Sequence, residues 1–210
     1  MSTSARRPGR PQRGTRTIDR EMIGEATVRV LSTLGAGELS MSKIAAELGV
    51  RSQSLYHHVS TLSDAVNAAR SVLCAAVDLR VFETDDWHDA VVRFADTYYL
   101  AFSPLRQASS VFFLHRITDP TTLRVYESFL ARAERAGLTG APALQLLLDV
   151  EHSVFSLIFE QTSWSTLFSS EAIEQGDFPR LEASLPQRDL GSDAIRARVR
   201  KVALSLVRGV

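Results

Sequence analysis

Apolar residues recur every three or four positions along most of this chain, which is the period of an α-helix. The first such pattern covers residues 17–34 and is ended by Gly35-Ala36-Gly37. Its apolar positions lie four apart: Ile18, Met22, Ala26, Val30 and Leu34. The short alternation typical of strands bounded by turn residues is not found in the sequence. The pattern predicts an all-α protein.

Residues 39–50 predict a short helix followed by a tight turn. Ser40 is a favourable N-cap residue, and the apolar positions after it share one helix face: Ile44, Ala45 and Leu48. Gly49 then supplies the backbone freedom that a tight turn needs.

A second short helix is predicted from about Ser52. Leu55 and Val59, four residues apart, form its inward face. The outward side chains are hydrogen-bonding and almost uncharged, which suits base edges and phosphates in a major groove. The two helices together predict a helix-turn-helix, and the alternative is a helical hairpin that only packs in a core.

Six further helical patterns follow along the chain. Two begin at Ser103-Pro104 and Asp119-Pro120, because proline is favourable at the first helical position. The expected helices cover residues 61–82, 86–102, 103–115, 119–137, 142–168 and 192–208. Residues 169–192 lose the period and predict a loop with one helical turn around Leu181. The pattern over 142–168 is too apolar for a surface helix, and with 192–208 it predicts a homodimer built as a four-helix bundle.

Composition restricts the class of protein. The chain has 210 residues, of which 45% are apolar, and the N-terminus is polar and rich in arginine. We see neither a membrane span nor a signal peptide, and we expect a cytoplasmic protein. The single Cys74 excludes an internal disulfide framework and a cysteine-based zinc site. The motifs typical of enzymes are absent, and we expect no cofactor and no metal.

The net charge of zero hides an asymmetry. Residues 1–70 hold ten Lys/Arg and six Asp/Glu, and the rest of the chain holds the opposite excess. The basic part contains the helix-turn-helix, as expected if it meets DNA.

Residues 1–16 predict a disordered arm, because they combine several arginines with Pro and Gly. The segment from Arg6 to Pro11 is similar to the Gly-Arg-Pro core of AT-hook peptides, which lie in A·T-rich minor grooves. The DNA-binding candidates in the arm are Arg6, Arg7, Arg10 and Arg13. The alternative is a solvated tail.

The three-helix N-terminal unit, with its segments 39–50 and 55–59, resembles the TetR family of transcriptional repressors. The match is specific over roughly residues 17–62. It implies an N-terminal DNA-binding domain (17–62) and a C-terminal helical domain (63–210) that binds a small molecule and forms the homodimer. The resemblance also implies a palindromic double-stranded operator that is released when the small molecule enters.

The same resemblance assigns the DNA contacts. Ser40 and Lys43 are placed at the phosphate backbone, and seven side chains at bases or backbone: Arg51, Ser52, Gln53, Ser54, Tyr56, His57 and His58. The chain departs from the family at Leu62, where members commonly have a phosphate-contacting lysine. Loss of one contact lowers the salt dependence by about one unit of slope, and the arginine arm is expected to compensate.

The ligand site is expected among the middle helices, where apolar walls hold few polar groups. The candidates are Phe94, Tyr98, Phe102, Phe112, His115, Phe129, His152, Phe155 and Phe159. They favour a small apolar or aromatic inducer, although aromatic stripes on helices are more often plain core. Two other readings stay open: a helical enzyme or carrier, and a DNA-binding protein regulated by a partner protein.

For the repressor, we expect ligand to change the spacing of the two recognition helices through the helix 61–82. Half-sites on one face of DNA need centres about 34–36 Å apart, so a shift of a few ångströms prevents both from docking.

Overall fold

The computed structural model describes residues 18–84, 86–185 and 189–210, and these fold entirely into helices and connecting turns. This confirms the all-α prediction. The α-helices are α1 (Arg20–Leu34), α2 (Met41–Leu48), α3 (Ser52–Leu55), α4 (Leu62–Ala75), α5 (Trp87–Phe102), α6 (Pro120–Arg135), α7 (Gly140–Leu167), α8 (Ser170–Gln175), α9 (Pro179–Ser184) and α10 (Ser192–Arg208). Three 3₁₀ segments join them: η1 (Ala36–Glu38), η2 (Leu79–Glu83) and η3 (Ser103–Leu114).

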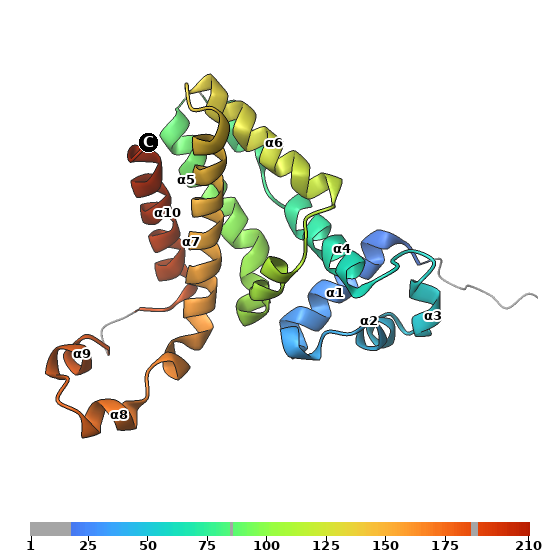
Figure 1. Cartoon of the computed structure of the whole chain (residues 1–210), viewed down its shortest axis with the longest axis horizontal. Coiled ribbons are helices and arrows are strands. Elements are labelled where there is room, and N and C mark those ends of the chain that lie inside the picture. The colour runs from blue at the N-terminus through green and yellow to red at the C-terminus, as the bar shows by residue number, and fades with distance from the viewer. Residues whose placement is uncertain (1–17, 85, 186–188) are drawn as a thin grey trace, which may run out of the picture.

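The helices form two groups (Figure 1). α1, α2 and α3 gather at one end, whereas α5, α7 and α10 run side by side at the other. α4 and α6 lie between the groups, and α8 and α9 project away from the end of α7. The short helices α2 and α3 thus lie apart from α5, α7 and α10.

The N-terminal group has its own small core. Ile23, Ile44 and Leu55, one from each of the first three helices, are fully buried in it. The predicted cap is present: the Ser40 side chain accepts from the backbone N–H of Lys43. At the start of α4, Thr61 and Asp64 form a complete capping box. These caps satisfy backbone donors that a helix start leaves free.

The C-terminal group encloses a larger, aromatic core. Its central rings come from α5, α6 and α7 and pack tilted, stacked or edge to face, with centroids 4.5–5.6 Å apart. Charged pairs fasten its outer layer: Asp96 on α5 accepts bidentate hydrogen bonds from both Arg196 and Arg200 on α10 at 2.6–3.0 Å.

α4 is fastened to both groups. Gly24 of α1 lies so close to it that an added Cβ would sit 2.4 Å from the carbonyl oxygen of Ala68. On its other side the buried Arg70 donates to the carbonyl oxygens of Phe112 (2.6 Å) and His115 (3.2 Å). Arg70 therefore links α4, which packs on the N-terminal unit, to η3 and the residue that follows it.

Several predicted elements differ in the structure. The helix expected over 61–82 ends at Ala75 and is followed by η2, and Ala76 is exposed. The helix expected from Ser103 is the 3₁₀ segment η3, broken at Arg106, whose φ of 51° and ψ of −129° are not helical. The region 169–192 contains two short helices, α8 and α9, where one turn was expected.

The faces of two helices, α1 and α6, also differ from the predicted pattern. Leu34 and Leu123 are about half exposed, and Val125 replaces Leu123 in the core. α6 is rotated because Arg132 is buried: its Nε donates to the carbonyl oxygen of Thr84, and its guanidinium lies over the ring of Trp87.

α7 meets a length and composition criterion for a membrane span over Gly140–Gln161, contrary to the sequence prediction that no such run exists. It nevertheless packs against α5, α6 and α10. The central core helix of a helical protein can meet the same criterion, and α7 packs against other helices as such a helix does.

Candidate nucleic-acid interface and ligand site

The turn between α2 and α3 has the geometry that the sequence predicted. Gly49 adopts the left-handed conformation (φ 68°, ψ 30°), which glycine reaches without strain. Its N–H donates to the carbonyl oxygen of Ala46, and that of Val50 donates to Ala45, both at 3.0 Å. These bonds close α2 and fix the direction in which α3 leaves.

α3 is short and is held by two buried anchors. Leu55 is 0% and Val59 1% exposed, and the N–H groups of His58 and Val59 both donate to the carbonyl oxygen of Leu55 at 2.9 Å. The remaining side chains of residues 51–58 face outward. Arg51, Gln53, Tyr56, His57 and His58 are exposed, and Ser52 and Ser54 are partly buried. The structure thus gathers the seven predicted recognition residues on one short segment, 51–58. The predicted second helix is shorter than expected, because α3 ends at Leu55 and Val59 lies beyond it.

α2 contributes the two residues predicted at the phosphate backbone. The Ser40 hydroxyl already caps α2, accepting from the backbone N–H of Lys43 at 3.3 Å. The Lys43 side chain is exposed and lies 3.8 Å from Glu38, a weak surface pair that phosphate can replace.

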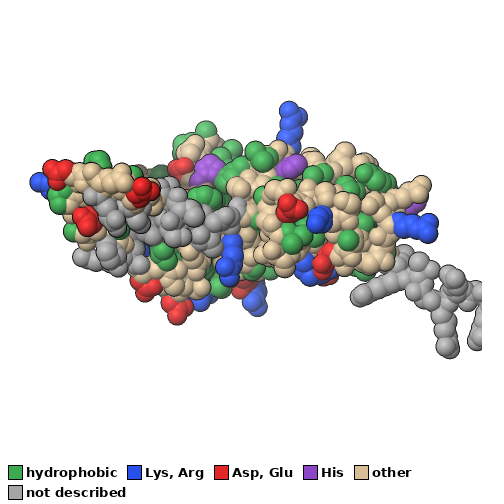
Figure 2. All heavy atoms as spheres, turned by 90° about the horizontal axis from the view of Figure 1, so that it is seen from below, with side chains coloured by type: hydrophobic (Ala, Val, Ile, Leu, Met, Phe, Trp, Pro, Cys, Tyr) green, Lys and Arg blue, Asp and Glu red, His purple; other side chains and the backbone are tan. Residues whose placement is uncertain are grey.

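The charge of this end is mixed. Figure 2, which views the molecule from below Figure 1, shows basic and acidic side chains on the half that holds the helix-turn-helix. Glu47 is paired with Arg29 at 2.7 Å. The arm residues Arg6, Arg7, Arg10 and Arg13 lie outside the described residues.

Most of the predicted ligand residues lie in the packed aromatic core. Phe94, Tyr98, Phe102, Phe112, Phe129 and Phe155 are each at most 5% exposed. They contact one another: Tyr98 stacks on Phe102 at 4.5 Å, for example. His115 lies beside this core, partly buried.

Three predicted residues do border a surface hollow of about 230 Å³: His152, Phe155 and Phe159. Phe113 closes the same hollow, with its ring 5.6 Å from His152 and 5.1 Å from Phe155. The sequence analysis missed Phe113, because a regular helix places only one of two adjacent phenylalanines on a given face and Phe112 fitted the stripe.

A buried carboxylate lies behind this hollow. Glu151 of α7 accepts a hydrogen bond from Tyr98 and another, at 2.6 Å, from Tyr126. Burial raises the pKa of both tyrosines, and the adjacent Glu151 raises it further. Burial likewise raises the pKa of the neighbouring Cys74 thiol to about 12, so it stays protonated. Among the described residues there is no cluster suited to a metal ion.

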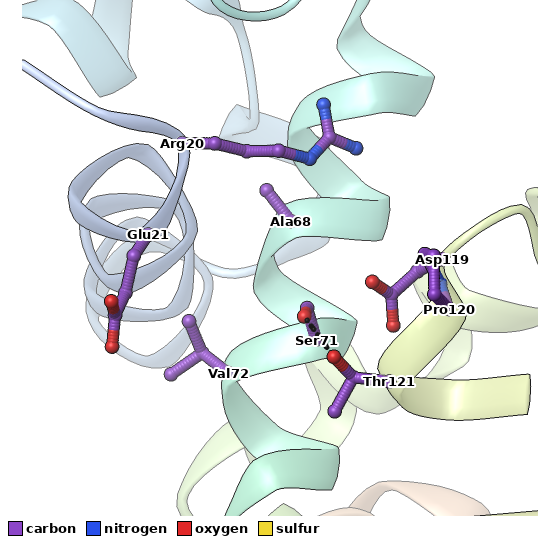
Figure 3. A pocket seen from close by; sticks show the side chains of 8 residues that line it. All are labelled: Arg20, Glu21, Ala68, Ser71, Val72, Asp119, Pro120 and Thr121. Atoms are coloured by element: carbon purple, nitrogen blue, oxygen red, sulfur yellow. Dashed lines mark hydrogen bonds between the residues drawn. The ribbon is translucent and has the colours of Figure 1, made fainter. Parts of the chain in front are cut away.

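Two larger hollows lie away from the aromatic core. One, of about 420 Å³, opens between α1, α4 and the start of α6 (Figure 3). The other, of about 410 Å³, lies where the first turns of α7 meet the end of α10 and is bordered by Leu146 and Leu206.

Comparison with known proteins gives consistent matches. Residues 23–60 match the family described as bacterial regulatory proteins, tetR family. An HTH-type transcriptional regulator from Saccharopolyspora erythraea is 26% identical over 201 residues, covering 88% of this chain and 85% of the relative.

Solved structures share the fold. A possible TetR family transcriptional regulator from Streptomyces coelicolor A3(2) superposes with a TM-score of 0.73 at 22% identity, covering 91% of this chain and 99% of the other. ActR from Streptomyces coelicolor, solved in complex with actinorhodin, gives a TM-score of 0.70 at 19% identity, covering 91% and 98%.

Proposed function

Because this chain belongs to the TetR family of bacterial regulatory proteins, a family of transcriptional regulators and not of enzymes, we propose that it is a homodimeric repressor. It binds a palindromic operator through residues 17–62 and is released when a small molecule enters residues 63–210. A regulator of this kind works where the DNA is, and we place it in the cytoplasm.

The observation that carries this proposal is the outward face of the segment 51–59, which consists of α3 and the residues next to it. Five exposed hydrogen-bonding side chains stand on an element whose inward residues, Leu55 and Val59, are fully buried. Such an element keeps its shape while its polar edge enters a major groove. We assign base contacts to Arg51, Ser52, Gln53, Ser54 and His57, and phosphate or base contacts to Ser40, Lys43, Tyr56 and His58.

We propose that the inducer binds between α7 and η3, starting from the hollow that Phe113, His152, Phe155 and Phe159 border. At about 230 Å³ it is smaller than ordinary ligand sites of about 300–1,000 Å³. Phe113 is 55% exposed, so its ring can turn outward and enlarge the hollow toward Tyr98 and Glu151. The apolar walls favour a small apolar or aromatic molecule, and the structural neighbour ActR is solved with actinorhodin.

The route to DNA runs through η3 and α4. Arg70 holds α4 to the carbonyl oxygens of Phe112 and His115, which are next to Phe113. A ligand that displaces Phe113 shifts these carbonyls, and α4 with them. Because Gly24 packs tightly on α4, α1 and the recognition helix follow.

For dimerisation we propose α7 and α10. Leu144 of α7 is 41% exposed, and Val202, Leu204 and Leu206 of α10 are only partly buried in the single chain. This apolar surface, together with the hollow at Leu146 and Leu206, is what a second copy would cover.

The test measures binding to duplexes from the region upstream of the gene, against scrambled duplexes, at several salt concentrations. The expected result is dimer binding that is at least tenfold tighter to one palindromic duplex. Gln53→Ala and His57→Ala are expected to weaken this binding about tenfold or more, since each lost base contact costs about 1–3 kcal/mol.

Gln175→Ala, at an exposed glutamine on α8, is the matched control and is expected to leave operator binding unchanged. Deletion of residues 1–14 tests the arm and is expected to reduce the salt dependence along with affinity. Equal weak binding to all duplexes would contradict the proposed function.

A further inference from the structure

The hollow between α1, α4 and the start of α6 is separate from the proposed inducer site and from the recognition helix (Figure 3). Its volume of about 420 Å³ lies in the range of ordinary ligand sites. It joins the N-terminal unit to the C-terminal helices. An occupant would therefore touch both parts of the regulator at once.

One end of this hollow holds a buried acceptor. Asp119 is only 5% exposed, and its Oδ2 accepts from the backbone N–H and the hydroxyl of Thr122, both at 2.7 Å. Among the described residues its Oδ1 has no hydrogen-bond donor, and Figure 3 shows the carboxylate pointing across the hollow toward α4. Asp119 is thus a largely buried residue whose Oδ1 is open to the hollow, where a charged donor such as an ammonium group can bind it.

The other end holds a cation. Arg20, at the start of α1, extends over α4, and its one hydrogen bond in the described structure is from Nη2 to the carbonyl oxygen of Asp64, at 3.4 Å. Four of the five N–H donors of a guanidinium are therefore available to a carboxylate. Glu21 lies at the edge of the same hollow.

The middle of the hollow is lined by apolar side chains and by hydroxyl groups that already hydrogen-bond to each other. Ala68, Val72 and Pro120 supply carbon surface. Ser71 and Thr121 donate and accept within their own pair at 3.1 Å. The lining thus places available groups of opposite charge on either side of an apolar floor.

We propose that this hollow is an effector site for a small zwitterion, whose ammonium group binds Asp119 and whose carboxylate binds Arg20. A short hydrocarbon chain between the two groups lies on Ala68 and Val72. Bound there, the zwitterion links α1 and α4 to α6 and favours one angle between the two parts of the protein.

Calorimetric titration of the full-length protein without DNA tests this proposal independently of the operator. The probes are glycine, β-alanine, 4-aminobutyrate and 6-aminohexanoate, with butylamine and butyrate as analogues that carry one charge. The expected result is saturable binding of at least one zwitterion, at least tenfold tighter than either single-charge analogue.

Two variants locate the site. Asp119→Asn keeps a good N-cap for α6 while removing the negative charge. Arg20→Gln removes the positive charge. Each variant is expected to bind the zwitterion at least tenfold more weakly than the parent protein. Asp86→Asn, the same change at the cap of α5, is the matched control and is expected to bind as the parent does. The proposal is overturned if none of the zwitterions binds, if a single-charge analogue binds equally well, or if either variant retains the affinity.

Discussion

At the scale of the residue, Gly24 decides how closely α1 and α4 approach. A Cβ there would meet the backbone of Ala68 at 2.4 Å and the side chain of Val72 at 2.9 Å. Gly24→Ala is expected to lower the free energy of unfolding by about 1–3 kcal/mol, as overpacked sites do. Denaturant unfolding measures it, with Gly37→Ala as the control because nothing lies within 4 Å of a Cβ at Gly37. Equal stability of the parent and Gly24→Ala would contradict the packing described.

The ion pairs of Asp96 predict how the free energy of unfolding depends on pH. Burial opposes ionisation of Asp96, but hydrogen bonds from Arg196 and Arg200 outweigh it and lower its pKa below the usual value of 3.8. A carboxyl with a lowered pKa stabilises the fold above its ordinary pKa, and this stabilisation is lost as the pH falls through the folded-state value. Asp96→Asn is expected to cost roughly 1–2 kcal/mol at pH 7, since hydrogen bonds to charged groups are involved and Arg200 is half exposed.

The measurement for Asp96 is the free energy of unfolding of parent and variant from pH 7 to pH 3. The difference between them is expected to shrink toward pH 3. A difference that stays constant over this range would show that the carboxylate charge contributes nothing.

At the scale of the element, η3 contains a strained position. Arg106 has a φ of 51° and a ψ of −129°, which a residue with a side chain rarely adopts. Relief of such strain raises the free energy of unfolding by about 1–3 kcal/mol. The greater freedom of glycine in the unfolded chain lowers it by up to about 1 kcal/mol. Arg106→Gly is expected to raise the free energy of unfolding by about 1 kcal/mol. Arg116→Gly, at an exposed residue with negative φ, is expected to lower it; the same sign for both variants would refute the strain.

The same element shows where sequence reasoning stops. The caps at Ser40, Thr61 and Asp119 were predictable because their signals are local: a side chain bonds a backbone group three residues on. The strain at Arg106 was not, because no local signal in the sequence marks it; η3 also packs against α7 and α1, which are separate elements of the chain. The turn of α6 that buries Arg132 likewise depends on Thr84 and Trp87, which are distant in sequence.

The candidate DNA-binding residues could be predicted from the sequence, whereas the candidate ligand residues could be predicted only in part. The recognition residues lie within the eight positions 51–58, so their closeness in the sequence alone places them together at α3. The ligand residues come from α5, α6, α7 and η3, and their helical stripe does not distinguish a ring that packs in the core, such as Phe129, from one that borders a hollow, such as Phe159. Phe113 was missed because η3 is not a regular helix.

At the scale of the whole molecule, the account depends on a dimer formed by α7 and α10. Leu144→Arg is expected to shift the protein from dimer to monomer in sedimentation equilibrium, because it places a charge in an apolar interface. Leu123→Arg, the same change at a leucine of similar exposure on α6, is the matched control and is expected to remain dimeric. A dimer in both variants would place the interface elsewhere.

The central claim is that two copies of α3 read one palindromic site, and selection from a pool of random-sequence duplexes tests it most directly. The account predicts enrichment of an inverted repeat whose half-site centres lie about 34–36 Å apart along the DNA, or a multiple of this. Enrichment is expected to disappear for His57→Ala and to persist for Gln175→Ala. Absence of enrichment, or enrichment of a site without two-fold symmetry, would contradict the account.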